Sequence, residues 1–325
     1  MVSRRTLICT VALAGARRAF GQPAAPVRLF TFRQSFWLNL HHFLYVLGRA
    51  RNNEPDSRRA AVAGASIEGQ EILGRPEPDR TAWDKAVANY ASSVSKKDLV
   101  FDRSLSLLTK TIGDVGDNAP ALSSAIDAPV REALWAAAPI YRGVWGGRHS
   151  MANQERTAEL KKLIAQYGNA IAGEVSRAYR TRWPEAGFHV DVVAYAQWAG
   201  AYSTVGRLIV LGSLDRAQAG TQGLESIFHE AMHQWDNATD RAIQEIATKS
   251  GRPVPRALSH SLIFYTAGYV VAKLVPAHRP YAMINGLWDN RGLVDKEKLD
   301  RFWRPYLEGK TGFDEAMESL LEALA

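Results

Sequence analysis

Residues 226–236 read SIFHEAMHQWD, and this stretch decides how the rest of the chain is interpreted. On a helix, side chains at positions i and i+4 lie on one face, about 5–6 Å apart at Cβ. His229 and His233 can therefore offer two imidazole nitrogens to one metal ion, and Glu230 stands beside the first of them. The neighbouring residues are mostly apolar, which is typical of a helix buried inside a protein. The pattern predicts a metal site with zinc as the ion.

A buried helix whose histidines only pack and form hydrogen bonds is the alternative interpretation. It requires partners for two imidazoles and a carboxylate on one apolar helix, because an unpaired polar group is costly to bury. A metal ion supplies such a partner, so the spacing favours the metal site.

Length and composition exclude several classes of protein. The 325 residues are 46% hydrophobic and 10% aromatic, which allows one large domain or two smaller ones with a sizeable core. The formal net charge is +7, but four arginines lie among the first 18 residues, and without them the charge is +3. No basic stripe alternates with aromatic residues, so we expect no nucleic acid partner.

The first 21 residues have the composition of a signal peptide. A charged start with Arg4 and Arg5 is followed by an apolar run to Ala16 and a small-residue end at residues 19–21. Residues 3–8, SRRTLI, resemble a bacterial twin-arginine signal. The apolar run is too short to span a bilayer, and no other segment of the sequence is long and apolar enough. We therefore expect an exported protein, periplasmic or extracellular, without stable membrane insertion.

Cys9 is the only cysteine and lies inside this predicted signal peptide. The mature chain would then have no thiol for nucleophilic catalysis, for a disulfide or for a Cys-ligated zinc site. Histidine and carboxylate side chains remain as metal ligands.

Periodicity predicts a mostly helical protein with a short stretch of sheet. After a Pro-rich lead-in at 22–33, apolar residues recur with helical spacing at 34–51, 54–73, 79–95, after residue 129 and at about 151–183. β-branched residues then predict strands at 188–195 and 207–211, with a loop at 199–203 between them. Helices are expected again at 236–250, 256–275, 295–307 and 313–324. The expected fold class is α+β, predominantly α-helical, with a helical region at 22–186.

The order strand, strand, H-E-x-x-H helix and further helices resembles that of the zincin metallopeptidases, over roughly residues 187–275. The resemblance implies a small twisted sheet packed on the active-site helix, an edge strand that aligns an extended peptide, and a catalytic region at 187–325. It also implies zinc-dependent hydrolysis of a peptide or protein substrate. Glu230 would act as the general base. The sequence does not indicate an oligomeric state.

A catalytic zinc needs a third protein ligand and one open position. The metzincin subgroup is excluded, because Asp236 stands where its glycine belongs and Thr239 where its third histidine belongs. Gluzincins take a glutamate from a helix about 20 or more residues further along, and the chain resembles this subgroup in having a helix at 256–275. That helix contains no Glu or Asp, and His260 is its one metal-competent side chain.

We therefore expect His229, His233 and His260 to bind the zinc ion. His260 is embedded among apolar neighbours in the sequence, and ligation would offset the cost of burying its imidazole. Glu245 is the main rival for the third position, and His149 is a more distant one.

The oxyanion of a hydrolytic reaction needs a second donor besides the metal. Tyr265, Tyr202 and His149 are the candidates, and Tyr265 is named as the catalytic one, although core packing is the role that its apolar surroundings favour. Asp236, three residues after His233, is a candidate to orient that ligand, with a helix-surface or capping role as the equal alternative. A zinc-binding protein without catalysis and a helical ligand-binding protein that retains the motif remain alternative functions.

Overall fold

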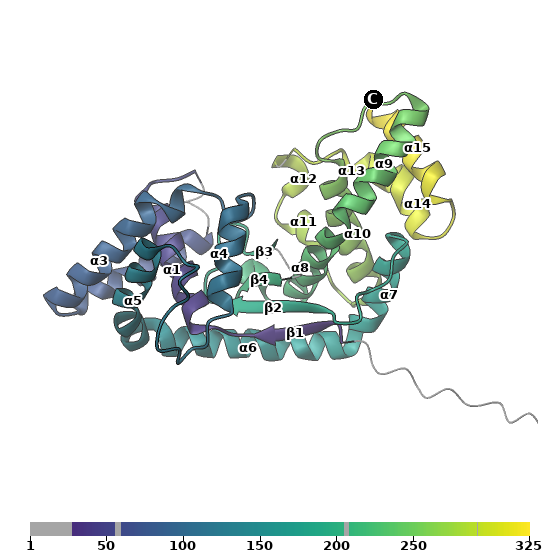
Figure 1. The fold of residues 1–325 in the computed structure, drawn as a ribbon. Coiled ribbons are helices and arrows are strands. Elements are labelled where there is room, and N and C mark those ends of the chain that lie inside the picture. Colours follow the sequence, from purple (N-terminus) through teal and green to yellow (C-terminus); the bar gives the residue numbers. More distant parts are fainter. Residues whose placement is uncertain (1–27, 56–59, 205–207, 291) are drawn as a thin grey trace, which may run out of the picture.

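Two groups of helices flank a small central sheet in the computed structural model, which describes residues 28–55, 60–204, 208–290 and 292–325 (Figure 1). The predicted signal peptide and Cys9 lie outside the described residues. Within the described ranges, no helix combines the length and apolar character needed to cross a membrane. The expected α+β class with mostly helical content is confirmed.

The sheet has the strand order β1-β2-β4-β3. Its strands are β1 (Phe30–Arg33), β2 (Phe188–Val193), β3 (Ala201–Thr204) and β4 (Leu208–Gly212). β1, β2 and β4 run parallel, and β3 pairs antiparallel with β4 at one edge. Among the residues that the structure describes, β3 therefore has a strand partner on one side only.

Two of these strands, β1 and β3, were not predicted from the sequence. β1 falls in the predicted lead-in, and β3 replaces the predicted loop at 199–203. Each has four residues, too few to establish a periodicity, and each depends on pairing with a distant strand. Gly187, before β2, has φ +62°, and a Cβ there would lie 2.0 Å from the carbonyl oxygen of Arg28. Only glycine lets the backbone adopt this conformation without a clash.

The N-terminal lobe consists of helices that pack around α1 (Phe36–Arg51). They are α2 (Ala60–Gly69), α3 (Glu77–Ser92), α4 (Arg103–Gly113) and α5 (Ala128–Tyr141). Helical turns at Gln70–Gly74 and Val94–Lys96 follow α2 and α3. The α4 helix was not predicted.

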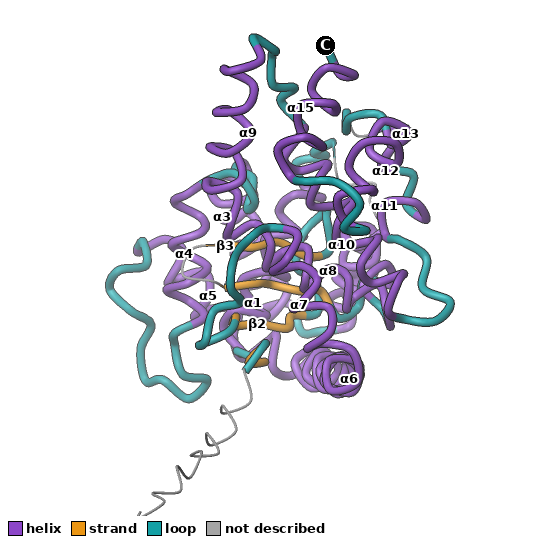
Figure 2. Tube along the Cα trace, turned by 90° about the vertical axis from the view of Figure 1, so that its right-hand side faces the viewer, coloured by secondary structure: helices purple, strands orange, loops and turns teal. Residues whose placement is uncertain are grey.

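A continuous helical path then runs past the sheet. π-helical turns at Arg142–Gly146 and Ile164–Gly168 join α5 to α6 (Gly147–Leu163) and α6 to α7 (Asn169–Ala178). The chain therefore remains helical from Ala128 to Ala178. Figure 2 shows α6 nearly end-on below the strands.

The C-terminal lobe is built on α8 (Gly220–Met232), α9 (Asp236–Ser250) and α10 (Leu258–Leu274). Short helices follow: α11 (Tyr281–Ile284), α12 (Leu287–Asn290), α13 (Lys296–Lys298), α14 (Arg304–Leu307) and the longer α15 (Phe313–Leu324). A π-helical turn at Leu299–Trp303 joins α13 to α14, and a 3-10 turn at Arg216–Gln218 precedes α8. The helices predicted at 236–250 and 256–275 are confirmed.

Alternation along the strands connects the sheet to both lobes. Phe188, Val190 and Val192 share a core with Ile227 and Phe228 of α8. On the opposite face, Val193, Tyr202 and Val210 join the core of the N-terminal lobe. The sheet thus fixes α8 against β3, where the candidate site lies. The boundary predicted at residue 187 stays a prediction, although β1 from the N-terminal side pairs with β2 from the other side.

Candidate metal centre

Helix α8 carries the H-E-x-x-H residues and is buried over most of its length. The α-helix ends at Met232, and His233–Trp235 form one 3-10 turn, so the helix that carries the motif tightens in its last turn. The two histidine rings still meet, with their centroids 5.0 Å apart.

A third imidazole from α10 completes the group. The ring centroid of His260 lies 5.4 Å from that of His229 and 5.2 Å from that of His233. One ring nitrogen from each of the three histidines lies within 4.8 Å of the other two. Tetrahedral ligation at 2.0–2.1 Å brings nitrogens to roughly 3.3 Å from one another, so modest ring rotations would close the group on an ion. The three histidines can hold a metal ion.

His260 lies beside the two motif histidines as predicted, but it is not buried as its apolar neighbours predicted. His229 is buried and His233 half-buried, whereas His260 is exposed. His260 lies near the start of α10, on the wall of a cleft. Phe264, one turn further, packs its ring 4.2 Å from that of His229 and 4.7 Å from that of His260. Leu258, Leu262 and Ile263 of the same helix are instead buried in the hydrophobic cores.

The rival ligands lie elsewhere. Glu245 is exposed on α9 and borders a surface hollow with Arg241 and Lys249. His149 is buried in the N-terminal lobe, where Tyr141 Oη lies 2.8 Å from its Nδ1 and Glu68 Oε2 lies 3.0 Å from its Nε2. Neither side chain belongs to the group of three histidines.

Hydrogen bonds indicate how the histidines could bind an ion. His233 Nδ1 lies 2.8 Å from Asp236 Oδ2, which leaves Nε2 as its metal-binding nitrogen. His229 Nδ1 is buried and has no hydrogen-bond partner among the described residues. A buried, unpartnered imidazole nitrogen is costly in an apolar helix. The donor set therefore suits a metal ion that binds imidazole.

The protonation of the three imidazoles differs. Burial, together with the neighbouring histidines, lowers the pKa of His229. The His260 side chain is exposed at the cleft, but its ring loses hydration against the cleft wall, and this desolvation and the charge of His233 lower its pKa to about 4. Both rings are therefore neutral near pH 7, the form that binds metal. Burial also lowers the pKa of His233, but the hydrogen bond with Asp236 and the charge of Glu230 outweigh it and raise the pKa overall.

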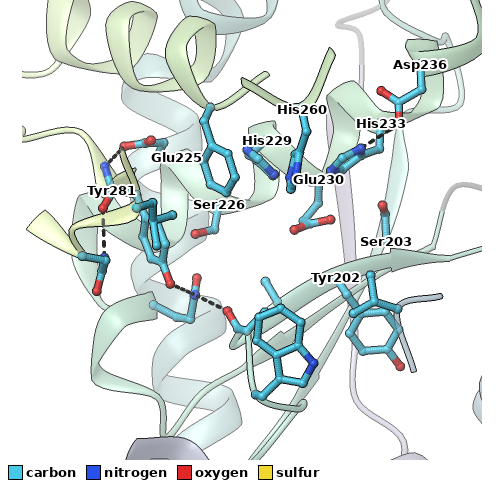
Figure 3. A pocket seen from close by; sticks show the side chains of 18 of the residues that line it. Tyr202, Ser203, Glu225, Ser226, His229, Glu230, His233, Asp236, His260 and Tyr281 are labelled. Atoms are coloured by element: carbon cyan, nitrogen blue, oxygen red, sulfur yellow. Dashed lines mark hydrogen bonds and ion pairs between the residues drawn. The ribbon is translucent and has the colours of Figure 1, made fainter. Parts of the chain in front are cut away.

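Glu230 lies in the same cleft. Its side chain is buried, and burial raises its pKa, while the charge of His233 and hydrogen bonding with Ser203 of β3 oppose the shift. Figure 3 shows the carboxyl group beside the imidazoles of His233 and His260, on the side that faces Ser203. A carboxyl group with a raised pKa is suited to exchange protons near neutral pH.

The cleft has a volume of about 700 Å³, which is within the range of ligand-binding pockets. Its lining comes from distant parts of the chain: residues 100–101, residues 198–204 with β3, helices α8 and α10, and residues 281–293. Both lobes therefore line the cleft, and the three histidines of the candidate metal centre are part of its lining.

The predicted catalytic role of Tyr265 is not supported by its position. Its hydroxyl donates to Asp300, and its ring packs against Tyr269 and Trp288 in the C-terminal core. Successive helical residues are about 100° apart, so Tyr265 is turned away from the cleft that Phe264 lines. Tyr265 has a packing role.

The other two oxyanion candidates are also engaged elsewhere. Tyr202 lines the cleft, but its hydroxyl lies 2.8 Å from His42 Nε2 in the N-terminal lobe. His149 is held by Tyr141 and Glu68, as described above. The residues that the sequence analysis missed are Ser203, Phe264, Phe101 and Trp198, which line the cleft. For Ser203, the alternation within β3 was the available signal.

Comparison with protein-family models, with curated proteins and with solved structures gives no match to this chain. The interpretation of the site therefore depends on its own geometry.

Proposed function

We propose that the protein is a zinc-dependent peptide hydrolase in which His229, His233 and His260 bind the ion and Glu230 is the general base. The observation that carries the proposal is the convergence of three imidazole nitrogens within 4.8 Å, in a cleft that Glu230 also lines. The two motif histidines and the third histidine come from different helices, α8 and α10.

A bound zinc ion would polarise a substrate carbonyl and lower the pKa of water. Glu230 accepts the proton that the attacking water loses and delivers it to the leaving amine. Asp236 holds the His233 ring through Nδ1 and so directs Nε2 toward the other two imidazoles. Within the cleft, His229 and Glu230 are buried, whereas His260 is exposed.

The number of ligands favours catalysis over a purely structural metal site. Structural zinc sites have four protein ligands, whereas catalytic sites have three and an open position. Among the described residues, the group of possible ligands contains the three histidines and no fourth His, Cys, Asp or Glu. A zinc-binding protein without catalysis is thus the less favoured alternative.

A peptide substrate is supported by the position of β3. The strand lies at the edge of the sheet, and Tyr202, Ser203 and Thr204 line the cleft. An extended peptide can add to such an edge through main-chain hydrogen bonds. The proposal includes a zincin-like arrangement of sheet and α8, of gluzincin type with a histidine in place of the glutamate ligand, and export through the N-terminal signal.

The test is peptide hydrolysis by the zinc-loaded protein and by Glu230→Gln. The variant should keep its zinc, because Glu230 is not a ligand, and its rate should fall by about 10²–10⁴-fold. Glu245→Gln makes the same change on the exposed face of α9 and should behave as wild type. A Glu230→Gln protein that hydrolyses at the wild-type rate would contradict the proposal.

A further inference from the structure

An exposed aromatic side chain stands at the cleft. Phe101 is 80% exposed and lines the cleft together with Val100. Single exposed apolar residues are common on protein surfaces. Phe101 differs from them because the turn that carries it is fixed by several hydrogen bonds.

The turn at residues 97–102 is anchored at both ends. Tyr45 Oη donates to the carbonyl oxygen of Lys97 at 2.9 Å, and the Asp102 N–H donates to the carbonyl oxygen of Asp98 at 2.9 Å. Asp98 Oδ1 accepts the N–H of Val100 at 2.8 Å. Between them, Leu99 is 1% exposed and fixes the turn to the lobe. Phe101 is therefore presented by a backbone that is already ordered.

The same turn positions a second aromatic residue. Trp198 donates its indole N–H to Asp98 Oδ2 at 3.1 Å, and Trp198 also lines the cleft. Val100, Phe101 and Trp198 thus form one apolar surface of the N-terminal lobe, which we name the N-lobe wall.

Apolar residues of the C-terminal lobe line the other side. Phe264, Leu287 and Leu293 come from α10, α12 and the segment after α12, and we name them the C-lobe wall. Figure 1 shows α4, which follows Phe101, in the N-terminal group of helices and α12 in the C-terminal group. Because Phe264 contacts the rings of His229 and His260, the space between the walls adjoins the metal centre.

The charge of the cleft limits what can enter it. Apart from its histidines and tyrosines, the ionisable side chains that line the cleft are Glu225, Glu230 and Asp236. No Lys or Arg occurs among the described residues that line it. Glu225 is already engaged, since its Oε2 lies 2.7 Å from His278 Nε2 and accepts the Tyr281 N–H at 2.8 Å. An acidic side chain or a terminal carboxylate would lose hydration here and gain no cationic side-chain partner.

We propose that the space between the N-lobe wall and the C-lobe wall is a specificity subsite for a large apolar or aromatic side chain in the interior of a peptide. The inference rests on the proposed peptide hydrolysis for the identity of its ligand. It adds the substrate class: peptides with an aromatic or large aliphatic residue near the scissile bond, flanked by residues without negative charge.

Binding to the Glu230→Gln protein tests the subsite without turnover. The probes are amidated peptides that differ at one position, with Phe, Ala or Glu there, and calorimetry measures their dissociation constants. The Phe peptide should bind about tenfold more tightly than the Ala peptide, and the Glu peptide should bind most weakly. Adding Phe101→Ala should remove most of the preference for Phe over Ala.

Leu107→Ala is the matched control, because Leu107 is 49% exposed on α4 and does not line the cleft. It should leave the preference unchanged. Equal affinity for the Phe and Ala peptides, a full preference in Phe101→Ala, or no binding of any peptide would overturn the subsite. Zinc-loaded wild type that binds with the expected preference but hydrolyses none of the peptides would instead contradict the proposed function.

Discussion

At the scale of single residues, the hydrogen bond between Asp236 and His233 gives the metal centre its orientation. Asp236 Oδ2 lies 2.8 Å from His233 Nδ1, at the point where the 3-10 turn passes into α9. Carboxylates in this position fix the ring and increase its basicity toward the metal. The interaction spans three residues, which is why the sequence could suggest it.

Asp236→Ala should weaken zinc affinity by roughly 10–100-fold, because the His233 ring loses its orienting partner. Competition with a chromophoric chelator measures the change. Glu245→Ala removes a carboxylate from the same helix, on its exposed face, and should leave the affinity as it is. Equal zinc affinity in Asp236→Ala and wild type would show that the hydrogen bond does not support metal binding.

At the scale of elements, β3 links the two faces of the sheet. Residues alternate along it, so Ser203 reaches Glu230 on one face and Tyr202 reaches His42 on the other. Burial lowers the pKa of His42 to about 4, and its Nδ1–H donates to the carbonyl oxygen of Leu38 at 2.8 Å. The neutral ring therefore accepts a hydrogen bond from the Tyr202 hydroxyl at Nε2. This bond holds the edge strand to α1.

Tyr202→Phe should reduce the free energy of unfolding by about 1–3 kcal/mol, because it leaves the buried His42 Nε2 without its donor. Urea titration measures the difference. Tyr269→Phe is the control, since the Tyr269 hydroxyl has an exposed contact of 3.5 Å with Glu308. If both variants lose the same small amount, the His42 contact does not anchor β3.

Some features of these elements could be predicted from the sequence, and others depend on how the elements pack. The pairing of His229 with His233 depends on helical spacing alone, so it could be predicted. The position of His260 followed from the order of the helices, but its exposure and the orientation of Tyr265 depend on how α10 is rotated in its packing. Phe101 belongs to a turn more than a hundred residues from α8, and no local pattern connects the two.

At the scale of the whole molecule, Glu68 of α2 joins separate parts of the N-terminal lobe. Its Oε2 lies 3.0 Å from His149 Nε2 on α6 and accepts the Tyr195 hydroxyl at 2.7 Å, after β2. Oε1 accepts from Arg148. Although burial raises the pKa of Glu68, these contacts outweigh it and lower the pKa to about 2.

A lowered carboxyl pKa stabilises the folded state above the unfolded value, near pH 4.5, and this contribution is lost as the pH falls toward about 2. The free energy of unfolding should therefore fall over this window more steeply in wild type than in Glu68→Gln. Glu71→Gln, at an exposed neighbouring position, should keep the wild-type slope. Urea titrations at pH 7, 4.5 and 3 compare them, and parallel curves for wild type and Glu68→Gln would exclude this role.

The central claim is that three histidines from two helices bind one zinc ion. The direct measurement is the zinc content of purified wild type, His260→Ala and Glu245→Ala after dialysis, with circular dichroism to confirm folding. Wild type and Glu245→Ala should each hold about one zinc per chain, and His260→Ala should hold far less. A folded His260→Ala protein with the full zinc content, or a wild type that binds none, would contradict the account.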